Sequence, residues 1–176
     1  MIGTKVIVSG DIGSGKSTAI RATLARLGWQ KPGGFFTHWG KAERGGPVLF
    51  LETWSGAVHP IAHRIAAPAK PGGLPYELDA TVFNRVAMTS LQPAAAGQPV
   101  VIDELGLIEL GAATFVQALA NLFQSPAPVV AVIQRRALDA WLDQLGAGGR
   151  TARHFDVEAA TRYALPLQLA AAFGIS

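Results

Sequence analysis

The stretch SGDIGSGKSTAI, residues 9–20, decides the fold of this chain. It follows the short apolar run KVIV, residues 5–8, and opens a run whose apolar side chains recur with helical spacing. Between the two runs, GDIGSGKS at residues 10–17 matches the pattern G-x-x-x-x-G-K-[ST]. That pattern is a phosphate-binding loop when a strand precedes it and a helix follows it, and both are predicted here.

The composition of this loop suits an anion. Glycines let successive backbone N–H groups point inward, and the positive end of the following helix adds a favourable dipole. We expect Lys16 to reach the β- and γ-phosphates of a nucleotide and the Ser17 hydroxyl to ligate Mg²⁺. A dinucleotide fingerprint, G-x-G-x-x-G, is excluded because Thr18 replaces its third glycine. The residues expected to bind the nucleotide are Gly10, Asp11, Ile12, Gly13, Ser14, Gly15, Lys16, Ser17 and Thr18.

A second motif, VVIDELGLIEL at residues 100–110, ends an apolar run in acidic side chains. The run is typical of a central strand, and open α/β sheets bind ligands at the carboxyl ends of their strands. We expect Asp103 to hold Mg²⁺, directly or through water, and Glu104 to orient or polarise an attacking water molecule. Glu109 either lines the same site or faces solvent.

Strand and helix patterns alternate along the chain. Strands are predicted at residues 33–39, 47–54, 100–103, 127–134 and 154–158. Helices are predicted after an Asp79 cap, around residues 115–122, over residues 138–145 up to Gly146, and from the turn that contains Pro166. This alternation predicts an α/β domain with a mostly parallel sheet and right-handed crossovers.

The composition narrows the class of protein. The 176 residues suit one domain, and 49% hydrophobic against 15% charged residues argues against disorder. The net charge of +3 is small and the arginines are scattered, so no nucleic-acid footprint is expected. The absence of cysteine excludes disulfides and thiolate chemistry. No apolar run reaches the roughly 18 residues of a membrane helix, so we expect a cytoplasmic protein without a membrane partner.

Basic residues are candidates for neutralising charge on a transferred phosphate. Arg135 and Arg136 follow the apolar run at residues 129–133, which should deliver them to the phosphate side of the sheet. A solvated basic helix start is the equal alternative. A second copy of the chain, or a partner protein, is another source of such an arginine. Weaker candidates are Arg150, Arg153 and Arg162.

The histidines and serines give no stronger site. His59 and His63 are four residues apart, but Pro60 follows directly and the H-E-x-x-H acid is missing, which disfavours a metal site. His38 and Trp39 are expected in a loop, where they either flank the nucleotide or lie on the surface. No serine stands in a G-x-S-x-G elbow.

Together, GDIGSGKST, GFFT and VVIDELGLIEL resemble the small P-loop nucleoside-5'-triphosphatase family, whose members include the thermophile and the cancer-related nucleoside triphosphatases. The resemblance runs from the first strand to about Ile133, and the pair Thr161–Arg162 departs from the family's asparagine–arginine pair. The residues that match the family's second motif are Asp103, Glu104, Gly106, Glu109 and Leu110. The resemblance implies a RecA-like, three-layer P-loop NTPase fold with helices on both faces of the sheet. It also implies Mg²⁺-dependent hydrolysis of several nucleoside triphosphates with little base selectivity.

Two other classes stay open. A P-loop small-molecule kinase would need an acceptor pocket and a lid, for which residues 40–50 or 67–75 are the candidates. A nucleotide-gated binding or cofactor-delivery module would bind nucleotide with little turnover. The N-K-x-D motif that reads guanine is absent, which disfavours strict GTP specificity. The sequence therefore favours a triphosphatase and leaves turnover without an acceptor as the discriminating property.

Overall fold

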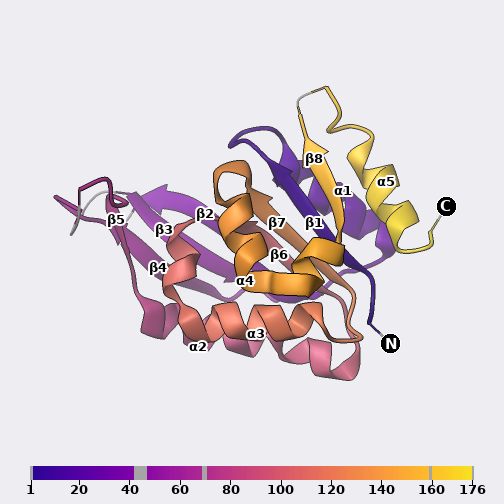
Figure 1. Cartoon of the computed structure of the whole chain (residues 1–176), viewed down its shortest axis with the longest axis horizontal. Helices are drawn as coiled ribbons and strands as arrows, with labels where there is room; N and C mark the ends of the chain where they lie inside the picture. The colour runs from indigo at the N-terminus through magenta and orange to yellow at the C-terminus, as the bar shows by residue number, and fades with distance from the viewer. Residues whose placement is uncertain (1, 42–46, 69–70, 159, 176) are drawn as a thin grey trace.

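The computed structural model describes residues 2–41, 47–68, 71–158 and 160–175. Over these residues the chain forms one eight-stranded sheet in the order β5-β4-β3-β2-β6-β7-β1-β8, with helices on both faces (Figure 1). The strands are β1 (Lys5–Gly10), β2 (Gly33–Lys41), β3 (Pro47–Thr53), β4 (Val58–Arg64), β5 (Tyr76–Leu78), β6 (Val100–Leu105), β7 (Val129–Gln134) and β8 (Arg153–Val157). The helices are α1 (Lys16–Leu27), α2 (Ala80–Leu91), α3 (Ala113–Phe123), α4 (Leu138–Thr151) and α5 (Leu165–Ala172).

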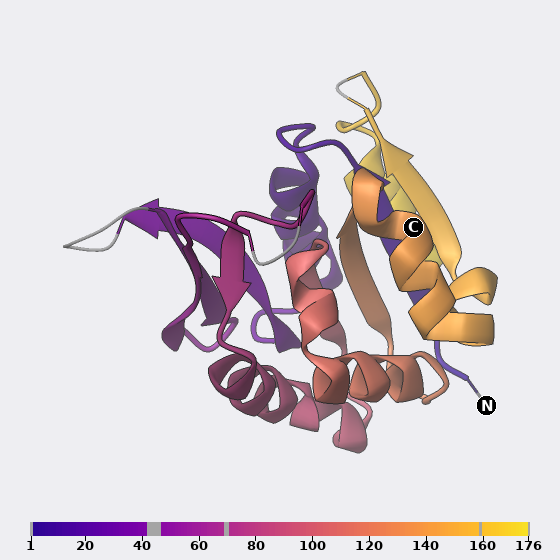
Figure 2. The same cartoon turned by 60° about the vertical axis from the view of Figure 1, so that its left-hand side comes forward.

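The sheet has a parallel part and an antiparallel part. Strand β1 pairs in parallel with β7 and β8, and β6 pairs in parallel with β2 and β7. Strands β3, β4 and β5 extend the sheet beyond β2 through antiparallel pairs, at one end of the molecule (Figure 2). The carboxyl ends of β1, β6, β7 and β8 therefore meet at one edge. The prediction of an α/β fold with a mostly parallel sheet and helices on both faces is confirmed.

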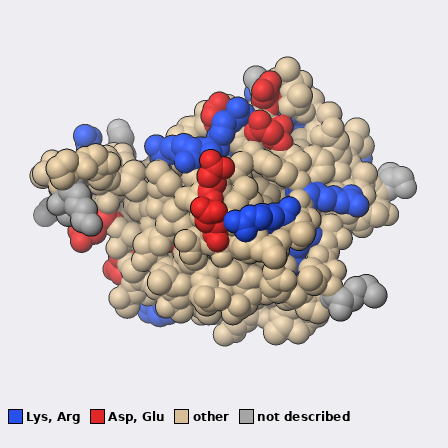
Figure 3. Space-filling view, in the orientation of Figure 1, with Lys and Arg blue, Asp and Glu red and all other residues tan. Residues whose placement is uncertain are grey.

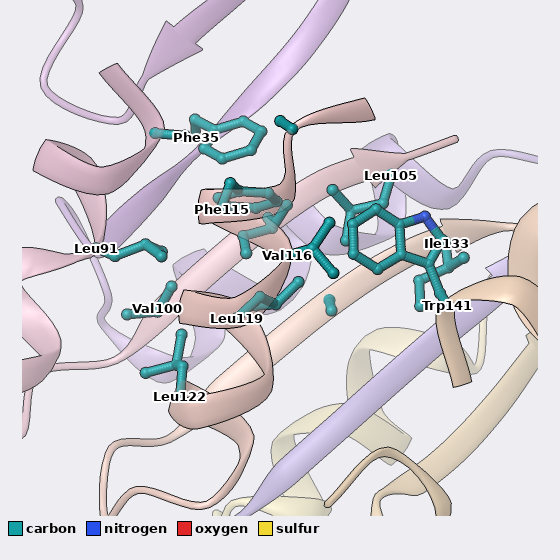
Figure 4. Packing of buried hydrophobic residues seen from close by; sticks show 14 of the residues in the cluster. Phe35, Leu91, Val100, Leu105, Phe115, Val116, Leu119, Leu122, Ile133 and Trp141 are labelled. Carbon is teal, nitrogen blue, oxygen red and sulfur yellow. The ribbon is translucent and has the colours of Figure 1, made fainter. Parts of the chain in front are cut away.

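Alternating residues of the central strands pack into two hydrophobic cores, one on each face of the sheet. Ile7 packs into the core under α2, α3 and α4, whereas its neighbours Val6 and Val8 pack into the core under α1 and α5. This period of two on both faces explains why the parallel strands read as continuous apolar runs. Figure 4 shows the larger core, in which Phe115 lies between Phe35 and Trp141. The phosphate-binding loop is thus mounted on a strand that is buried on both faces.

Two helix ends bear on the sequence analysis. The Asp79 side chain accepts a hydrogen bond from the backbone N–H of Val82 at 2.9 Å, as expected for the residue that caps α2. The helical stripe over residues 138–145 does break at Gly146, as predicted, because Gly146 has φ 59° and ψ −138°, which are not helical angles. A second helical stretch follows the break directly, so α4 (Leu138–Thr151) consists of two helices joined at a kink.

Gly34 marks a close approach between β2 and β6. Its φ is +92°, a conformation that glycine adopts without steric cost. A Cβ at this position would lie 2.2 Å from the carbonyl oxygen of Val101. The GFFT stretch can therefore pair with β6 only because its first residue has no side chain.

The antiparallel strands include segments that the sequence analysis did not assign. Strand β4 contains Pro60 and the histidines His59 and His63, so the helix needed for a histidine metal pair does not form. His38 and Trp39 lie within β2, in agreement with the strand predicted at residues 33–39, so the separate expectation that these two residues lie in a loop is wrong. No helix in the described ranges is long and apolar enough to cross a membrane.

Candidate active site

The phosphate-binding loop joins β1 directly to α1, which is the context that the motif requires. Gly13 and Gly15 take φ values of +80° and +93°, so two of its glycines adopt backbone angles that other residues rarely reach. A Cβ on Gly10 would lie 2.7 Å from the carbonyl oxygen of Val157. The Ser14 hydroxyl is buried and has no hydrogen-bond partner in the described part of the chain. A curled loop with a spare buried donor suits an anion.

Lys16 is the buried cation of the site, with 4% of its surface exposed. Its Nζ donates hydrogen bonds to the carbonyl oxygens of Gly10 at 3.1 Å and Asp11 at 2.6 Å. The same Nζ lies 3.3 Å from Oε2 of Glu104. Lys16 thus joins the phosphate-binding loop to the end of β6.

Ser17 and Asp103 lie side by side, since the Ser17 hydroxyl donates to Oδ1 of Asp103 at 3.1 Å. Burial raises the pKa of Asp103 to about 6, and the hydrogen bond from Ser17 works against that rise. Hydroxyl and carboxylate oxygens are the donors that Mg²⁺ prefers, and Mg²⁺ often takes few protein ligands and keeps water. Across the described residues, no group of three or more His, Cys, Asp or Glu residues gathers as a metal site. The Ser17–Asp103 pair therefore fits Mg²⁺ better than a metal that needs a full protein cage.

Glu104 occupies an irregularity of β6. The ladder to β7 pairs Asp103 with Val132 and Leu105 with Ile133, so Glu104 has no paired residue on β7. Such a bulge re-aims a side chain that regular alternation would send into the opposite face. The side chains of Asp103 and Glu104 therefore both reach the site at this edge of the sheet, although adjacent strand residues ordinarily point to opposite faces.

Gln134, at the end of β7, is a site residue that the sequence analysis missed. Its Nε2 donates to Oε1 of Glu104 at 2.9 Å, and its Oε1 accepts from Nε of Arg136 at 3.0 Å. The signal was present in the sequence, because a polar residue closes the apolar run VVAVI at the same sheet edge. Gln134 fixes the carboxylate of Glu104 on the side opposite Lys16.

Glu109 is 2% exposed, so the solvent-facing alternative for this residue is wrong. Its Oε2 accepts a hydrogen bond from the backbone N–H of Gly106 at 2.8 Å. Burial raises the pKa of Glu109 to about 7, and the hydrogen bond from Gly106 opposes the rise. The buried Glu109 side chain therefore stabilises the turn after β6 through its hydrogen bond with the backbone of Gly106.

The two candidate arginines have different surroundings. Nε of Arg135 lies 3.5 Å from Oδ1 of Asp11, and Nη2 of Arg135 lies 3.0 Å from Oδ1 of Asp156. Arg136 contacts Gln134 and lines a cavity of about 350 Å³ beside Glu104. Both arginines follow the end of β7 directly. Figure 3 shows acidic and basic side chains next to one another from the top to the centre of this face. Asp156, which pairs with Arg135, is another residue that the sequence analysis missed, in addition to Gln134.

The remaining candidates lie in other surroundings. Arg150 is exposed and pairs with Asp143 at 3.3 Å, and Arg153 opens β8 on the surface. Arg162 lies against the phosphate-binding loop, since a Cβ on Gly15 would come within 2.9 Å of its Cδ. The lid candidate at residues 40–50 lies partly outside the described residues, which omit 42–46, and the one at 67–75 lacks 69–70.

Comparisons with known proteins agree with this geometry. A family model described as NTPase matches residues 5–170. The chain is 30% identical to nucleoside-triphosphatase THEP1 of Methanosarcina acetivorans, over 73% of this chain and 75% of that protein. It is 32% identical to the cancer-related nucleoside-triphosphatase homolog of Bos taurus, over 71% of this chain and 72% of that protein. The crystal structure of THEP1 from Aquifex aeolicus superposes with a TM-score of 0.77 at 21% identity, over 97% and 99% of the two chains, which shows a common fold.

Proposed function

The chain belongs to the NTPase family and is a nucleoside-triphosphate phosphohydrolase, and on this premise we propose that its turnover requires Mg²⁺ and accepts several bases. The observation that carries the Mg²⁺ requirement is the contact of 3.1 Å between the Ser17 hydroxyl and Asp103 beside the loop. Lys16 supplies a cation for the phosphates, and Glu104, 3.3 Å from it, supplies a carboxylate for the attacking water.

Ser17 and Asp103 would hold the Mg²⁺, because they supply two adjacent oxygen donors beside the loop. Mg²⁺ bound there would neutralise charge on the β- and γ-phosphate oxygens. The buried Asp103 favours its protonated form more than an exposed aspartate does, so cation binding and loss of that proton should be coupled.

The chain's own groups divide the remaining work. The backbone N–H groups of the loop and Lys16 bind the phosphates, and Glu104 orients a water molecule and accepts its proton. The water oxygen bonds to the γ-phosphorus while the bond to the bridging oxygen of the β-phosphate breaks. The products are a nucleoside diphosphate and inorganic phosphate. Gln134 positions Glu104 through the hydrogen bond at 2.9 Å.

Phosphate release without an acceptor tests the activity. We expect release from ATP and GTP with Mg²⁺ and none after chelation of divalent cations. Release only when a hydroxyl acceptor is added would indicate a kinase. Nucleotide binding without release would indicate a gated binding module.

A metal-swap experiment tests the Mg²⁺ ligands. The chain has no cysteine, so Ser17→Cys introduces a unique thiol. This variant should be inactive with Mg²⁺ and regain activity with Mn²⁺ or Cd²⁺, because softer cations accept a thiolate ligand. The control is Ser90→Cys, which lies on α2, away from the loop, and should keep its Mg²⁺ activity. Equal activity of Ser17→Cys with Mg²⁺ would remove Ser17 from the metal site.

A further inference from the structure

A cavity lies at the edge of the sheet opposite the phosphate-binding loop. Its volume is about 400 Å³, within the range of about 300–1,000 Å³ typical of small-molecule sites. Its walls come from the segment before β2, the start of β2, the turn between β3 and β4, and the last turns of α2. Gly33, in the wall, pairs with Val100, and Asp103 follows Val100 by three residues, or roughly 10 Å along β6. The cavity is therefore separate from the site at Asp103.

The cavity carries positive charge without a compensating acid. Lys31, before β2, and Arg85, on α2, both line it, and His59 on β4 adds an imidazole. No aspartate or glutamate is among the described residues of its lining. Within the described ranges, neither Lys31 nor Arg85 takes part in an ion pair. An anion bound in the cavity would relieve the repulsion between these two cations.

Most hydroxyl groups of the cavity are already engaged. The Thr89 and Ser90 hydroxyls donate to carbonyl oxygens of their own helix, at 2.9 Å and 2.7 Å. The hydroxyls of Thr53 and Ser55 form a hydrogen bond with each other at 2.9 Å. The donors that remain for a ligand therefore belong mainly to the cationic side chains. A carboxylate or a phosphate suits them, because it can accept from a guanidinium through two oxygens at once.

Trp54 gives the cavity a fixed aromatic wall. Its Nε1 donates to the carbonyl oxygen of Val101 at 2.9 Å. Its ring centroid lies 5.0 Å from that of Phe36, and the Arg21 guanidinium lies 5.8 Å from the Trp54 ring. These contacts hold the indole in place before a ligand binds. Stacking of a planar group on it therefore costs little additional ordering of the protein.

We propose that this cavity binds a small organic anion, with a planar apolar body against Trp54 and a carboxylate or phosphate between Lys31 and Arg85. The side chains of Pro32 and Val86 supply further apolar surface for the planar body. The Arg85 fork matches the paired oxygens of either head group. A neutral ligand of the same shape binds more weakly, because it leaves both cations without a counter-charge.

Matched naphthalene probes separate the charge of the ligand from its ring. Binding of 2-naphthoate, 2-naphthyl phosphate and the neutral 2-naphthamide is measured by ligand-detected NMR titration. MgADP is present at saturation, so that the nucleotide site is filled. Both anions should bind, and the amide should bind roughly fivefold more weakly or worse. The tighter of the two anions identifies the preferred head group.

A double variant, Lys31→Ala with Arg85→Ala, tests the cavity directly. Both side chains are exposed, so the protein should still fold. The affinity for both anions should fall roughly fivefold or more, and that for the amide should not change. The matched control is Arg150→Ala with Arg153→Ala, which removes two exposed cations near the start of β8, at the far end of the sheet. This control should change nothing, and Trp54→Ala should weaken all three probes.

Several results would overturn the proposal. Absence of binding by both anions would remove the site, and equal affinities for the anions and the amide would remove its recognition of charge. Unchanged anion affinity in the variant at Lys31 and Arg85 would place the anion elsewhere. Equal loss in the control at Arg150 and Arg153 would reduce the effect to the net charge of the chain. Loss of anion binding on addition of MgADP would assign the probes to the nucleotide site.

Discussion

The parallel part of the sheet brings functional side chains together, whereas the antiparallel part does not. In the parallel part, the loop after β1 and the end of β6 bring Ser17 to 3.1 Å from Asp103 and Lys16 to 3.3 Å from Glu104. In the antiparallel part, successive strands end at opposite edges, and its ion pairs lie apart on the surface. One of these is His63–Glu77 at 3.6 Å, with side chains 61% and 66% exposed.

The difference lies in burial as much as in topology. Lys16 and Asp103 are 4% and 2% exposed, so the field between them is weakly screened by water. The exposed His63–Glu77 contact between β4 and β5 loses most of its interaction to solvent. Substitutions at the parallel edge should therefore change binding and rate strongly, and substitutions on the antiparallel strands should change little.

The largest effect is expected for Lys16→Ala. Removal of the cation should abolish measurable triphosphate binding, because no other buried cation among the described residues contacts the loop. The variant should still fold, and thermal unfolding followed by circular dichroism would verify this. Unchanged nucleotide affinity in a folded variant would contradict the assignment of the loop.

Glu104→Gln should lower kcat by roughly 10²–10⁴-fold, the range of a group that positions or deprotonates water. The amide keeps the size of the side chain and can still accept from Gln134, so binding of ATP should persist. Steady-state phosphate release together with nucleotide titration separates the two effects. Turnover at the parent rate would transfer the task to another group, and Glu109→Gln would then be the next variant.

Arg136→Ala should lower kcat by roughly 10³-fold, the lower end of the range for a charge-neutralising arginine. Arg136 lines the cavity beside Glu104, whereas Arg135 is engaged by Asp11 and Asp156. Arg135→Ala is the paired variant and should lose less. Both are assayed at saturating ATP over a dilution series.

The dilution series also tests the source of the arginine. Specific activity that rises with protein concentration would place the arginine on a second copy of the chain. Full activity of both variants at every dilution would exclude both residues.

Glu109→Gln should change the pH dependence of stability. The unfolded carboxyl ionises near pH 4.5 and the folded one near pH 7, so the folded state keeps its proton longer. The free energy of unfolding should therefore fall as pH rises between these values, by at most roughly 3 kcal/mol from this group. Urea unfolding at pH 5 and pH 7.5 should show a smaller fall in the variant. An identical fall would mean that Glu109 is not the titrating group.

The smallest effect is expected on β5. Glu77→Ala removes the exposed partner of His63 and should change the free energy of unfolding by less than about 1 kcal/mol. Phosphate release should stay at the parent rate. A large loss of either would show that the antiparallel strands support the parallel edge more than their exposure indicates.

The parallel part was predictable from sequence because its signals are local. Residues 5–8 and 129–133 are continuous apolar runs, and the phosphate-binding pattern fixes the strand–loop–helix order around Lys16. Strands β4 and β5 gave no such signal, since β4 contains a proline and two histidines and β5 has three residues. Their pairing depends on neighbours distant in the chain.

The site was predictable in its residue types more than in its contacts. Asp103 and Glu104 were placed at the edge by the motif, but alternation alone would have sent them to opposite faces. The bulge at Glu104 depends on pairing with β7, which no local pattern reports. The contacts of Arg135 with Asp156, from a strand later in the chain, were hidden for the same reason.

The close approach at Gly34 has a consequence for how this chain can change. Gly56 also has a positive φ, of +99°, yet a Cβ there would have nothing within 4 Å. A side chain at Gly56 would meet backbone strain but no collision, so a saturation library should recover substitutions such as Asn at Gly56 with reduced stability. At Gly34 every other amino acid collides with the Val101 carbonyl, whatever backbone angle it tolerates. Two glycines with similar angles are therefore under unequal mutational constraint, and only the one that faces another strand is irreplaceable.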